Sequence, residues 1–347
     1  MSNFTDFIGG AGGGGTVGRK YVDLIILDRS TTWSPRQDCK AVVTVIGGGG
    51  SGALTSRQSL GASGGGAGGL AQSDVIDLSA STTYTATVGS GGAPKYKYGG
   101  TSTQSGGAGG NSVFSGSDIT TLTGNGGSGG ATGTTATNGG SGGSASGGLY
   151  NYTGGAGGNA YSYSCGGGGA VNVTGTAYAG GDYTGGVEAT GGAGTGSSPY
   201  STGLSSQSTI QGGKAAIYSV VDFDYMIPKY VNPQGVNGTI DTITNTSYNA
   251  YSIIGFLDTP AMGVGGNGLS YQRLRATIKA QNGGMFAGGG AALTNSGSSF
   301  VISANAGDGG IFGGGGGGIR HGDGASQLTM SGAGGDGVVF IAVTEYL

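Results

Sequence analysis

Charged residues are scarce in this sequence. Only 9% of the residues are Asp, Glu, Lys or Arg, the formal net charge is -3, and residues 98–213 contain no lysine or arginine. Nucleic-acid binding needs clustered cations that neutralise phosphates, so this long stretch offers no such face. We therefore expect no nucleic-acid partner.

Cysteine and histidine are nearly absent. Cys39, Cys165 and His321 are the only residues of these two types. A zinc site needs several such ligands, and two cysteines do not make a disulfide framework. We expect two buried or free thiols in a protein made in a reducing cytoplasm, with no metal and no cofactor.

Long apolar runs are missing as well. No run approaches the roughly 18 apolar residues of a membrane-spanning helix. The start of the chain, residues 1–6, lacks the charged and apolar regions of a secretory signal. We expect no membrane insertion and no secretory leader.

Catalytic and ligand-binding motifs are weak or incomplete. The sequence His321-Gly322-Asp323 places two polar groups too close along a glycine-flanked loop to act together on one substrate. Asp308, Asp323 and Asp336 have glycine neighbours but lack the nonapeptide spacing of calcium-binding repeats. Gly-x-Gly-x-x-Gly matches are unavoidable at this glycine content, and no Gly-Lys-Ser/Thr supports a phosphate loop. We expect a protein that is not an enzyme, and calcium stays a weak alternative.

Glycine is what the chain has in excess, with 88 residues of 347. Such a composition is typical of a flexible linker or of disorder. Disorder, however, usually accompanies high net charge and few aromatic residues, whereas this chain has 18 tyrosines and 9 phenylalanines. The glycines also alternate with strand-like segments along the whole chain. These observations favour glycine as packed architecture.

The glycine runs have a period of three. Runs that begin at residues 106, 126, 139 and 154 each read as two Gly-Gly-X triplets. The scaffold glycines of these runs include Gly106, Gly107, Gly109, Gly110, Gly126, Gly127, Gly139, Gly140, Gly154 and Gly155. A period of three is that of the polyproline-II-type helix, which has no internal hydrogen bonds and must bond its neighbours when it is buried.

This register predicts a specific packing. Two glycines per triplet give two faces where neighbouring backbones meet, because no Cβ holds them apart. The four runs should lie side by side, and the remaining face should carry the residues in the third position: Ala108, Ser128, Ser141 and Ala156. The pure run 313–318 suits a helix surrounded on every side. Disorder of the same segments is the alternative.

Strand-like segments flank the glycine regions. Residues 39–46 and 337–344 are β-branched and bounded by glycine, and we expect both in one sheet. Residues 21–27 predict a strand packed on both faces, or an attachment segment. Further strands are expected at residues 74–78, 83–88, 215–225, 252–257, 274–279 and 300–304. The predicted fold class is all-β and irregular, with strands at both ends closing a sandwich of stacked polyglycine-II helices and essentially no α-helix.

The sequence around these strands resembles a known family. The segments are Trp33-Ser34-Pro35, residues 42–50, residues 84–92 and residues 334–341. They resemble the glycine-rich domain of bacteriophage tail-fibre and tail-tip proteins. The middle of the chain is similar to the polyglycine sandwich of the tip adhesins of T-even-like phages. That resemblance implies stacked polyglycine helices whose variable loops bind a receptor on the host surface.

The domain organisation follows from composition and from this resemblance. We expect an N-terminal attachment or assembly segment at residues 1–32 and a glycine-rich domain at residues 33–347. A less glycine-rich segment at about 214–280 could be a β insertion, an oligomer contact or a second binding patch.

Tyrosines gather in loops between the glycine runs. They are Tyr150, Tyr152, Tyr161, Tyr163, Tyr178 and Tyr183. Tyrosine among Ser, Gly and Asn is typical of a binding surface, since it gives a large contact at small entropic cost. The alternative is that these tyrosines cap the glycine lattice. If successive helices run antiparallel, alternate loops emerge at one end and form a shared tip.

The leading hypothesis is a phage tail-fibre or tail-tip adhesin on the virion, bound to a host receptor (protein or glycan) and to other tail-fibre subunits, with a homo-oligomer possible. The second is a structural subunit of a self-assembling extracellular filament or a virion stalk. A third is ice or carbohydrate binding by a flat, repetitive face.

Overall fold

The computed structural model describes the scaffold of the chain and parts of its loops. The described residues are 22–57, 59–161, 164–172, 175–182, 189–194, 208–210, 253–254, 265–266, 268–271, 277–294, 303–321 and 328–347. All regular elements among them are strands, which agrees with the predicted fold class. No helix in this part of the chain has the length and apolar character needed to cross a membrane.

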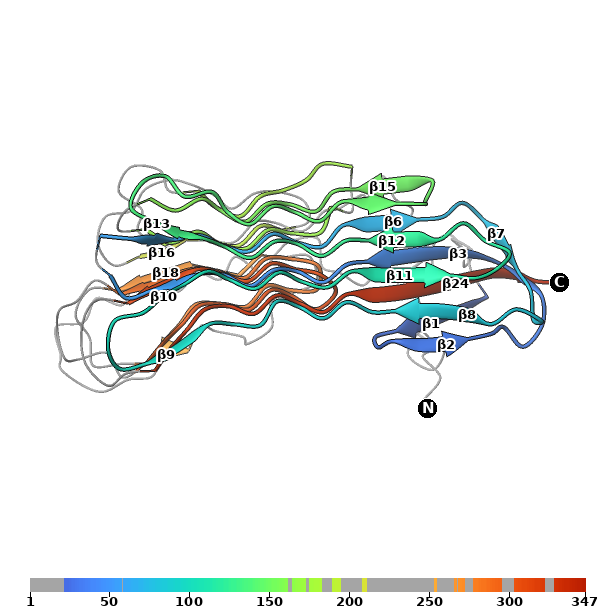
Figure 1. Cartoon of the computed structure of the whole chain (residues 1–347), viewed down its shortest axis with the longest axis horizontal. Helices are drawn as coiled ribbons and strands as arrows, with labels where there is room; N and C mark the ends of the chain where they lie inside the picture. Colours follow the sequence, from blue (N-terminus) through green and yellow to red (C-terminus); the bar gives the residue numbers. More distant parts are fainter. Residues whose placement is uncertain are drawn as a thin grey trace, which may run out of the picture.

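Figure 1 shows an elongated molecule with strands at both ends and glycine runs between them. One end, which we call the head, holds two sheets and the C-terminus. The opposite end, which we call the far end, holds three further sheets. The glycine runs carry the chain back and forth between the two, as where β3 leads into residues 47–53 and then β4.

The head is a two-sheet sandwich. Sheet I has the order β1 (Asp23–Leu27), β24 (Val338–Tyr346), β3 (Cys39–Ile46), β6 (Leu70–Gln72) and β15 (Tyr150–Tyr152), with β7 (Ile76–Leu78) also paired to β3. Sheet II has the order β14 (Ala145–Ser146), β12 (Leu122–Gly124), β11 (Ser112–Ser115), β8 (Tyr84–Thr87) and β2 (Thr31–Trp33). The expectation that residues 39–46 and 337–344 share a sheet is confirmed, since β3 and β24 pair antiparallel.

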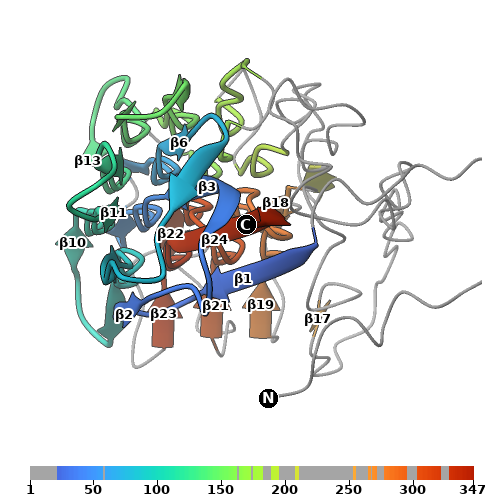
Figure 2. The same cartoon turned by 90° about the vertical axis from the view of Figure 1, so that its right-hand side faces the viewer.

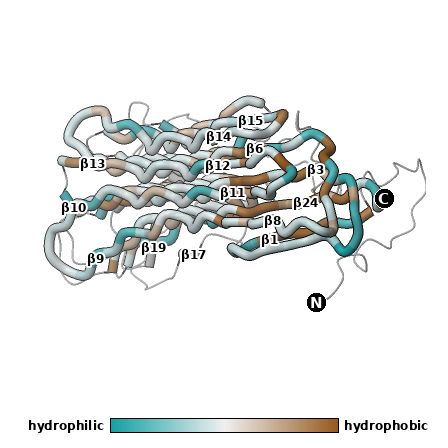
Figure 3. The backbone as a smooth tube through the Cα atoms, turned by 45° about the vertical axis from the view of Figure 1, so that its right-hand side comes forward, coloured by the Kyte–Doolittle hydropathy of each residue, from teal (hydrophilic) through white to brown (hydrophobic). Residues whose placement is uncertain are grey.

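The main apolar core lies between sheets I and II. Alternate residues of β3 and β24, including Val43, Val45 and Ile341, are fully buried against Tyr84 and Phe114. The rings of Tyr84 and Phe114 stack at a centroid distance of 5.5 Å. Figure 3 shows the same division, with apolar strands at the head and near-neutral glycine runs beyond them. The head therefore supplies the conventional hydrophobic core that the runs lack.

β1 is the edge strand of sheet I. Its neighbour is β24, and its Ile26 side chain is 43% exposed. The expectation of a strand packed on both faces was wrong, because Ile25 and Leu27 pack against the core on one face while Ile26 on the other face is exposed. The attachment role of residues 1–32 stays a prediction, and residues 1–21 lie outside the described part. β1 itself joins the sheet that the glycine-rich domain forms.

The far end consists of three sheets. Sheet III has the order β10 (Thr103–Gln104), β4 (Leu54–Thr55), β22 (Ile319–His321), β20 (Ala292–Thr294), β18 (Gly268–Tyr271) and β16 (Ser208–Ile210). Sheet IV pairs β13 (Thr132–Gly133) with β5 (Gly61–Ala62). Sheet V has the order β17 (Ile253–Ile254), β19 (Thr277–Lys279), β21 (Ser303–Asn305), β23 (Leu328–Met330) and β9 (Tyr96–Tyr98).

The other expected strands are found where the structure describes their residues. Residues 74–78 and 83–88 contain β7 and β8, residues 252–257 contain β17, and residues 274–279 contain β19. Residues 300–304 overlap β21. The expected strand at 215–225 and most of the 214–280 segment lie outside the described residues.

The three-residue period appears directly in the hydrogen bonds of the run 47–53. Successive N–H groups donate to three different neighbours and then return to the first, so residues three apart bond the same neighbour. The carbonyl groups accept from three further neighbours. The neighbours are residues 63–69, 107–110 and 332–335 for the N–H groups, and Gly92 with residues 127–130 and 316–319 for the carbonyls. This is hexagonal packing of three-residue-per-turn helices.

The run 313–319 repeats this arrangement at the centre of the lattice. Its N–H groups donate to residues 50–53, 166–169 and 307–310, and its carbonyls accept from residues 65–68, 289–292 and 332–335. Residues 313–318 are all buried. The prediction that this pure glycine run is surrounded on every side is confirmed.

Two tight reversals join these helices on the side of the head. The sequences 283–290 (GGMFAGGG) and 309–316 (GGIFGGGG) are near repeats, and in each the phenylalanine has a positive φ, 69° at Phe286 and 68° at Phe312. Both rings contact Phe340 of β24, at centroid distances of 6.4 and 5.3 Å. A left-handed backbone at phenylalanine is unfavourable, and here it places each ring in the apolar cluster between lattice and sheet I.

Candidate functional site

The four Gly-Gly-X runs lie side by side in sequence order. Hydrogen bonds join Gly109 N–H to Gly127 O at 2.9 Å, Ser128 N–H to Ser141 O at 2.8 Å and Gly157 N–H to Gly140 O at 2.8 Å. The third-position residues are all exposed: Ala108, Ser128, Ser141 and Ala156. The predicted packing of these runs is therefore confirmed, and they form the outer layer of the lattice.

Most of the ten scaffold glycines have no room for a side chain. A Cβ built on them would lie closer than 3.0 Å to a neighbouring backbone atom, except at Gly107 and Gly110. At Gly107 the nearest atom would be 3.5 Å away, and at Gly110 it would be 3.1 Å away. At both positions the nearest backbone atoms belong to residues 89–93. The remaining eight are fixed by backbone contact.

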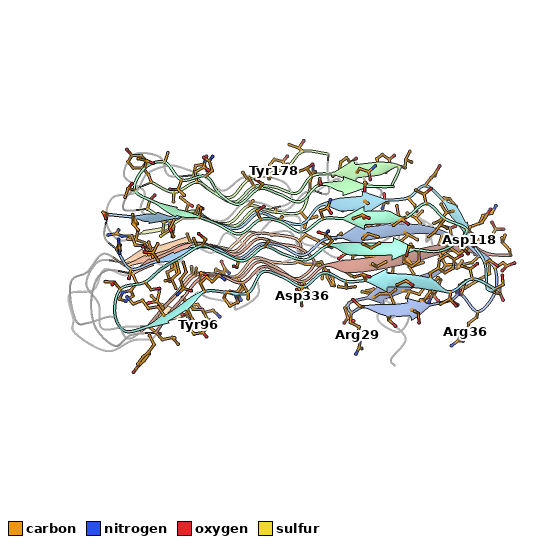
Figure 4. All side chains as sticks on the ribbon, viewed as in Figure 1. Arg29, Arg36, Tyr96, Asp118, Tyr178 and Asp336 are labelled. Carbon is orange, nitrogen blue, oxygen red and sulfur yellow. The ribbon has the colours of Figure 1, made fainter. Side chains whose placement is uncertain are left out.

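The structure brings Tyr150 and Tyr152 together at the head. Both lie on β15, their rings are 6.1 Å apart, and both are partly buried against the cluster that holds Val171 and Phe286. Burial, followed by the nearby Tyr150, raises the pKa of the Tyr152 hydroxyl. Tyr178 is also partly buried and lies on the upper side of the molecule in Figure 4. These three positions match the alternative of capping the lattice.

Tyr161 lies at the opposite end. Its neighbour Ala160 forms a bridge with Thr137, just beyond β13 at the far end. The Ser164 hydroxyl accepts the Tyr161 N–H at 2.7 Å and donates to the Tyr161 carbonyl at 3.0 Å. The Tyr161 side chain is 43% exposed. Tyr163 and Tyr183 lie outside the described residues. The four described tyrosines are separated: Tyr150 and Tyr152 lie at the head, Tyr178 on the upper side of the lattice and Tyr161 at the far end.

Sequence analysis missed the most exposed tyrosines of the described chain. Tyr96 and Tyr98 on β9 are 68% and 76% exposed, while Lys97 between them is buried. The sequence Lys95-Tyr96-Lys97-Tyr98 alternates with a period of two, which places both tyrosines on one face of a strand. That alternation was the signal available in the sequence. Figure 4 shows Tyr96 at the far end, on the lower side.

The outer face of sheet V continues from these tyrosines. Register pairs place Tyr98 opposite Leu328 and Tyr96 opposite Met330, and Met330 opposite Asn305. On the inner face, Lys97, Thr329 and Ala304 are buried. Figure 2 shows β19, β21 and β23 side by side along the lower edge of the molecule. We call the outer residues Tyr96, Tyr98, Leu328, Met330, Ser303, Asn305 and Lys279 the Tyr96–Tyr98 face.

The described charges divide between the two ends. At the far end the cations outnumber the carboxylates, and at the head the carboxylates dominate. The far-end residues are Arg57, Lys95, Lys279 and the buried Lys97 and Arg320, with Asp182 and Asp308. The residues at the head, or next to it in the case of Asp336, are Asp23, Asp28, Asp38, Asp74, Asp77, Asp118, Asp336 and Glu345 with Arg29, Arg36 and Lys40. Figure 4 marks Arg29, Arg36 and Asp118 at the head. Within the described residues, the far end thus attracts anions more than the head does.

Residues with reactive side chains do not form a cluster in the described part of the chain. His321 is buried in β22, and Asp323 lies outside the described residues. Among the described residues, no three His, Cys, Asp or Glu side chains lie close enough together to hold a metal ion. Cys39 and Cys165 are both buried thiols, as the sequence predicted. The carboxylates of Asp308 and Asp336 instead accept backbone N–H groups, from Ala333 at 2.8 Å and from Gly91 at 2.7 Å.

The fold and these surfaces define a class: an all-β protein in which a β-sandwich head continues into a hexagonal lattice of glycine helices. The chain belongs to the glycine-rich domain family, whose model matches residues 26–219, more than half of its length. The match begins inside β1, a few residues before the expected boundary at residue 33. No curated protein matches the chain.

Proposed function

We propose that this protein is a bacteriophage tail-fibre or tail-tip protein that binds a receptor on the host cell surface. The observation that carries the proposal is the two-ended architecture. Both the first described residues and the C-terminus lie at the head, whereas exposed tyrosines lie at the far end, beyond a rigid lattice. Such an arrangement suits attachment to other tail-fibre subunits at one end and recognition at the other. The resemblance to phage glycine-rich domains supports the same reading.

The proposed mechanism is adsorption by shape and aromatic contact, without bond chemistry. Each lattice run bonds several neighbours, so loops at its ends start from fixed positions. Preorganised loops lose less entropy on binding, which improves affinity. Tyrosines among small polar residues then supply adaptable contact area. The partner would be a protein or glycan of the host surface, and the protein would be part of the virion.

An adsorption assay tests this proposal. The purified protein is labelled and incubated with a panel of bacterial isolates, and the bound fraction is measured after sedimentation. We expect adsorption to a subset of isolates, and we expect it to weaken about tenfold when Tyr161 and its sequence neighbour Tyr163 are changed to alanine. The matched control changes Tyr150 and Tyr152 at the head and should retain adsorption once folding is verified.

Two outcomes would count against the proposal. If the wild-type protein adsorbs to none of the isolates, the proposed adhesin function is contradicted. Equal adsorption by a folded Tyr161/Tyr163 variant would remove the tyrosines of this loop from the receptor site and leave other far-end surfaces to be tested.

The edge strand β1 favours a second candidate, a subunit of a self-assembling filament or virion stalk. Ile26 and Val22 are 43% and 55% exposed beside an edge that β24 covers on one side only. Exposed apolar edges pair readily with other chains. Concentration-dependent fibres of the purified chain in electron micrographs would support this candidate, and a discrete particle at all concentrations would count against it.

A further inference from the structure

We infer that the Tyr96–Tyr98 face is a binding site for an acidic polysaccharide. The inference rests on the proposed function and deepens it, since it names the chemistry of the receptor and the surface that meets it. The six tyrosines that the sequence singled out do not belong to this face. The argument starts from the register of sheet V.

Two rows of side chains cross the outer face. One row runs from Tyr96 through Met330 and Asn305 to Lys279, and the other runs from Tyr98 through Leu328 to Ser303. Neighbouring strands in a sheet are about 4.8 Å apart, and residues two apart on a strand are separated by about 7 Å. The two tyrosines therefore stand side by side at one margin, and Lys279 stands three strands away in the same row. The face is long enough for several linked sugar rings.

The side chains on the outer face of sheet V are exposed, whereas those on its inner face are buried. Tyr96, Tyr98 and Leu328 are 68%, 76% and 43% exposed, whereas Lys97 and Thr329 are almost fully buried. Large apolar and aromatic side chains that gather on one exposed face usually mark an interaction surface. The backbone of this margin is fixed as well, because the Gln104 side chain donates to the Tyr96 carbonyl at 3.0 Å. The tyrosines thus stand on a braced strand.

The chemistry of the face matches a sugar chain. Pyranose rings present polarised C–H groups, which stack on the electron-rich face of an aromatic ring, and the tyrosine hydroxyl can bond sugar hydroxyls. Ser303 is partly exposed and adds a hydroxyl group in the middle of the face, whereas the Asn305 side-chain oxygen is buried. A flat sheet suits an extended polymer better than a folded protein, which would need shape complementarity over a larger area.

The cationic side chains at the far end favour an acidic polymer over a neutral one as the ligand. Lys279 lies in the Tyr96 row. Among the described residues of the far end, Arg57 is exposed, and Lys95 next to Tyr96 is partly exposed, as is Lys279. The carboxylates of Asp182 and Asp308 accept the backbone N–H groups of Asn159 and Ala333. A surface with this balance draws anionic ligands and repels cationic ones. The carboxylates of uronic acids in a polysaccharide would supply that negative charge at regular intervals.

The test measures binding of the full-length protein to defined polymers by affinity electrophoresis. The probes are alginate, polygalacturonate and hyaluronate, each beside its carboxyl-reduced, neutral form. We expect at least one acidic polymer to retard the protein and its neutral form to retard it far less. The double variant Tyr96→Ala/Tyr98→Ala should bind about tenfold more weakly, the effect of losing two stacking contacts. Lys279→Gln should bind roughly threefold more weakly and with a smaller salt dependence.

Controls keep the interpretation clear. Tyr96→Phe/Tyr98→Phe keeps both rings and should retain most of the binding, while Tyr150→Ala/Tyr152→Ala at the head should not change polymer binding. The unfolding midpoints of all variants are compared with that of the wild type. The inference is overturned if no acidic polymer binds, if the neutral forms bind equally well, or if the double alanine variant is folded and binds normally.

Cell adsorption separates this inference from the proposed function. Isolates that adsorb the wild type are treated with periodate, which cleaves sugar diols, or with protease. Loss of Tyr96/Tyr98-dependent adsorption after periodate supports the inference. Loss after protease alone indicates a protein receptor and overturns it while the adhesin function stands. Binding to acidic polymers without adsorption to any isolate supports the site and contradicts the adhesin function.

Discussion

Gly106 faces the carbonyl oxygen of Ser51 so closely that a Cβ on Gly106 would fall within 3.0 Å of that oxygen. Its neighbour Gly107 belongs to the same triplet, but a Cβ there would meet its nearest atom at 3.5 Å. Gly106 and Gly107 therefore differ in how closely they are packed, although both belong to the same run in the same outer layer.

This contrast predicts opposite effects of the same substitution. Gly106→Ala should lower the free energy of unfolding by about 1–3 kcal/mol, because the added methyl group must push two backbones apart. Gly107→Ala should be neutral or stabilising by up to about 1 kcal/mol, since alanine restricts the unfolded chain. Denaturant unfolding of both variants measures the difference. Equal destabilisation would show that the helices are not packed as described.

The triplet register was enough to predict the lattice. Glycine at two of three positions predicts two faces of the helix that lie against neighbouring backbones. The third position predicts the open face, which the exposed Ala108 and Ser128 confirm. The strands β3 and β24 were predictable for a related reason, since their β-branched runs bounded by glycine suit a buried sheet. Such patterns are predictive because each residue type in them reflects direct contact with a neighbouring backbone or side chain.

The position of the candidate binding site was harder to predict from the sequence than the lattice was. Which end a loop occupies depends on how many times the chain reverses. The reversals at Phe286 and Phe312 place a positive φ on phenylalanine, among glycines that also occur throughout the straight runs. Tyr150 and Tyr161 are close in sequence, but one glycine helix between them moves Tyr161 by roughly 25 Å at about 3.1 Å per residue. The exposure of Tyr96 depends on β23, which comes from the other end of the sequence.

The reversal at Phe286 gives a second prediction. Phe286→Ala should cost about 3–5 kcal/mol, because the ring fills the cluster between lattice and head. Phe286→Gly removes the same ring but relieves the positive φ of 69°, which costs a non-glycine residue about 1–2 kcal/mol. The glycine variant should therefore be more stable than the alanine variant, the reverse of the usual order.

Thermal and denaturant unfolding of the two Phe286 variants compare them directly. Phe114→Ala and Phe114→Gly serve as the control pair, since Phe114 lies in strand β11 and has no positive φ. There the glycine variant should be the less stable one. Finding the same order at both sites would contradict the role of the backbone conformation at Phe286.

The two cysteines give a third prediction. Cys39 and Cys165 are both fully buried, and burial, followed by the charge of Asp38, raises the pKa of the Cys39 thiol. Because the thiolate is the reactive form, neither cysteine should react with a thiol reagent in the folded protein at neutral pH. Both should react in denaturant. Rapid labelling of either residue in the folded protein would show that its end of the molecule opens.

Ionisation of Tyr84, in the core of the head, should lower the stability of the protein at alkaline pH. Its ring is fully buried, and its hydroxyl donates to the Asp118 carboxylate at 2.9 Å and accepts the Ser79 N–H at 2.8 Å. Burial is the main cause that raises the pKa of Tyr84 to about 12. An unfolded tyrosine ionises near pH 10, so folding favours the protonated phenol. The resulting stability is fully present below about pH 10 and is lost as the pH rises through about 12.

An ultraviolet titration measures this ionisation, with Tyr84→Phe as the reference. The difference between the two curves should isolate one tyrosine with a pKa of about 12, above the value of about 10 for a tyrosine in an unfolded chain. Tyr84→Phe should be about 1–2 kcal/mol less stable at neutral pH, because it leaves the Ser79 N–H and the Asp118 carboxylate without this partner. Its stability should also fall less steeply above pH 10. Parallel stability curves for both proteins between pH 10 and 12 would mean that the Tyr84 hydroxyl does not control alkaline unfolding.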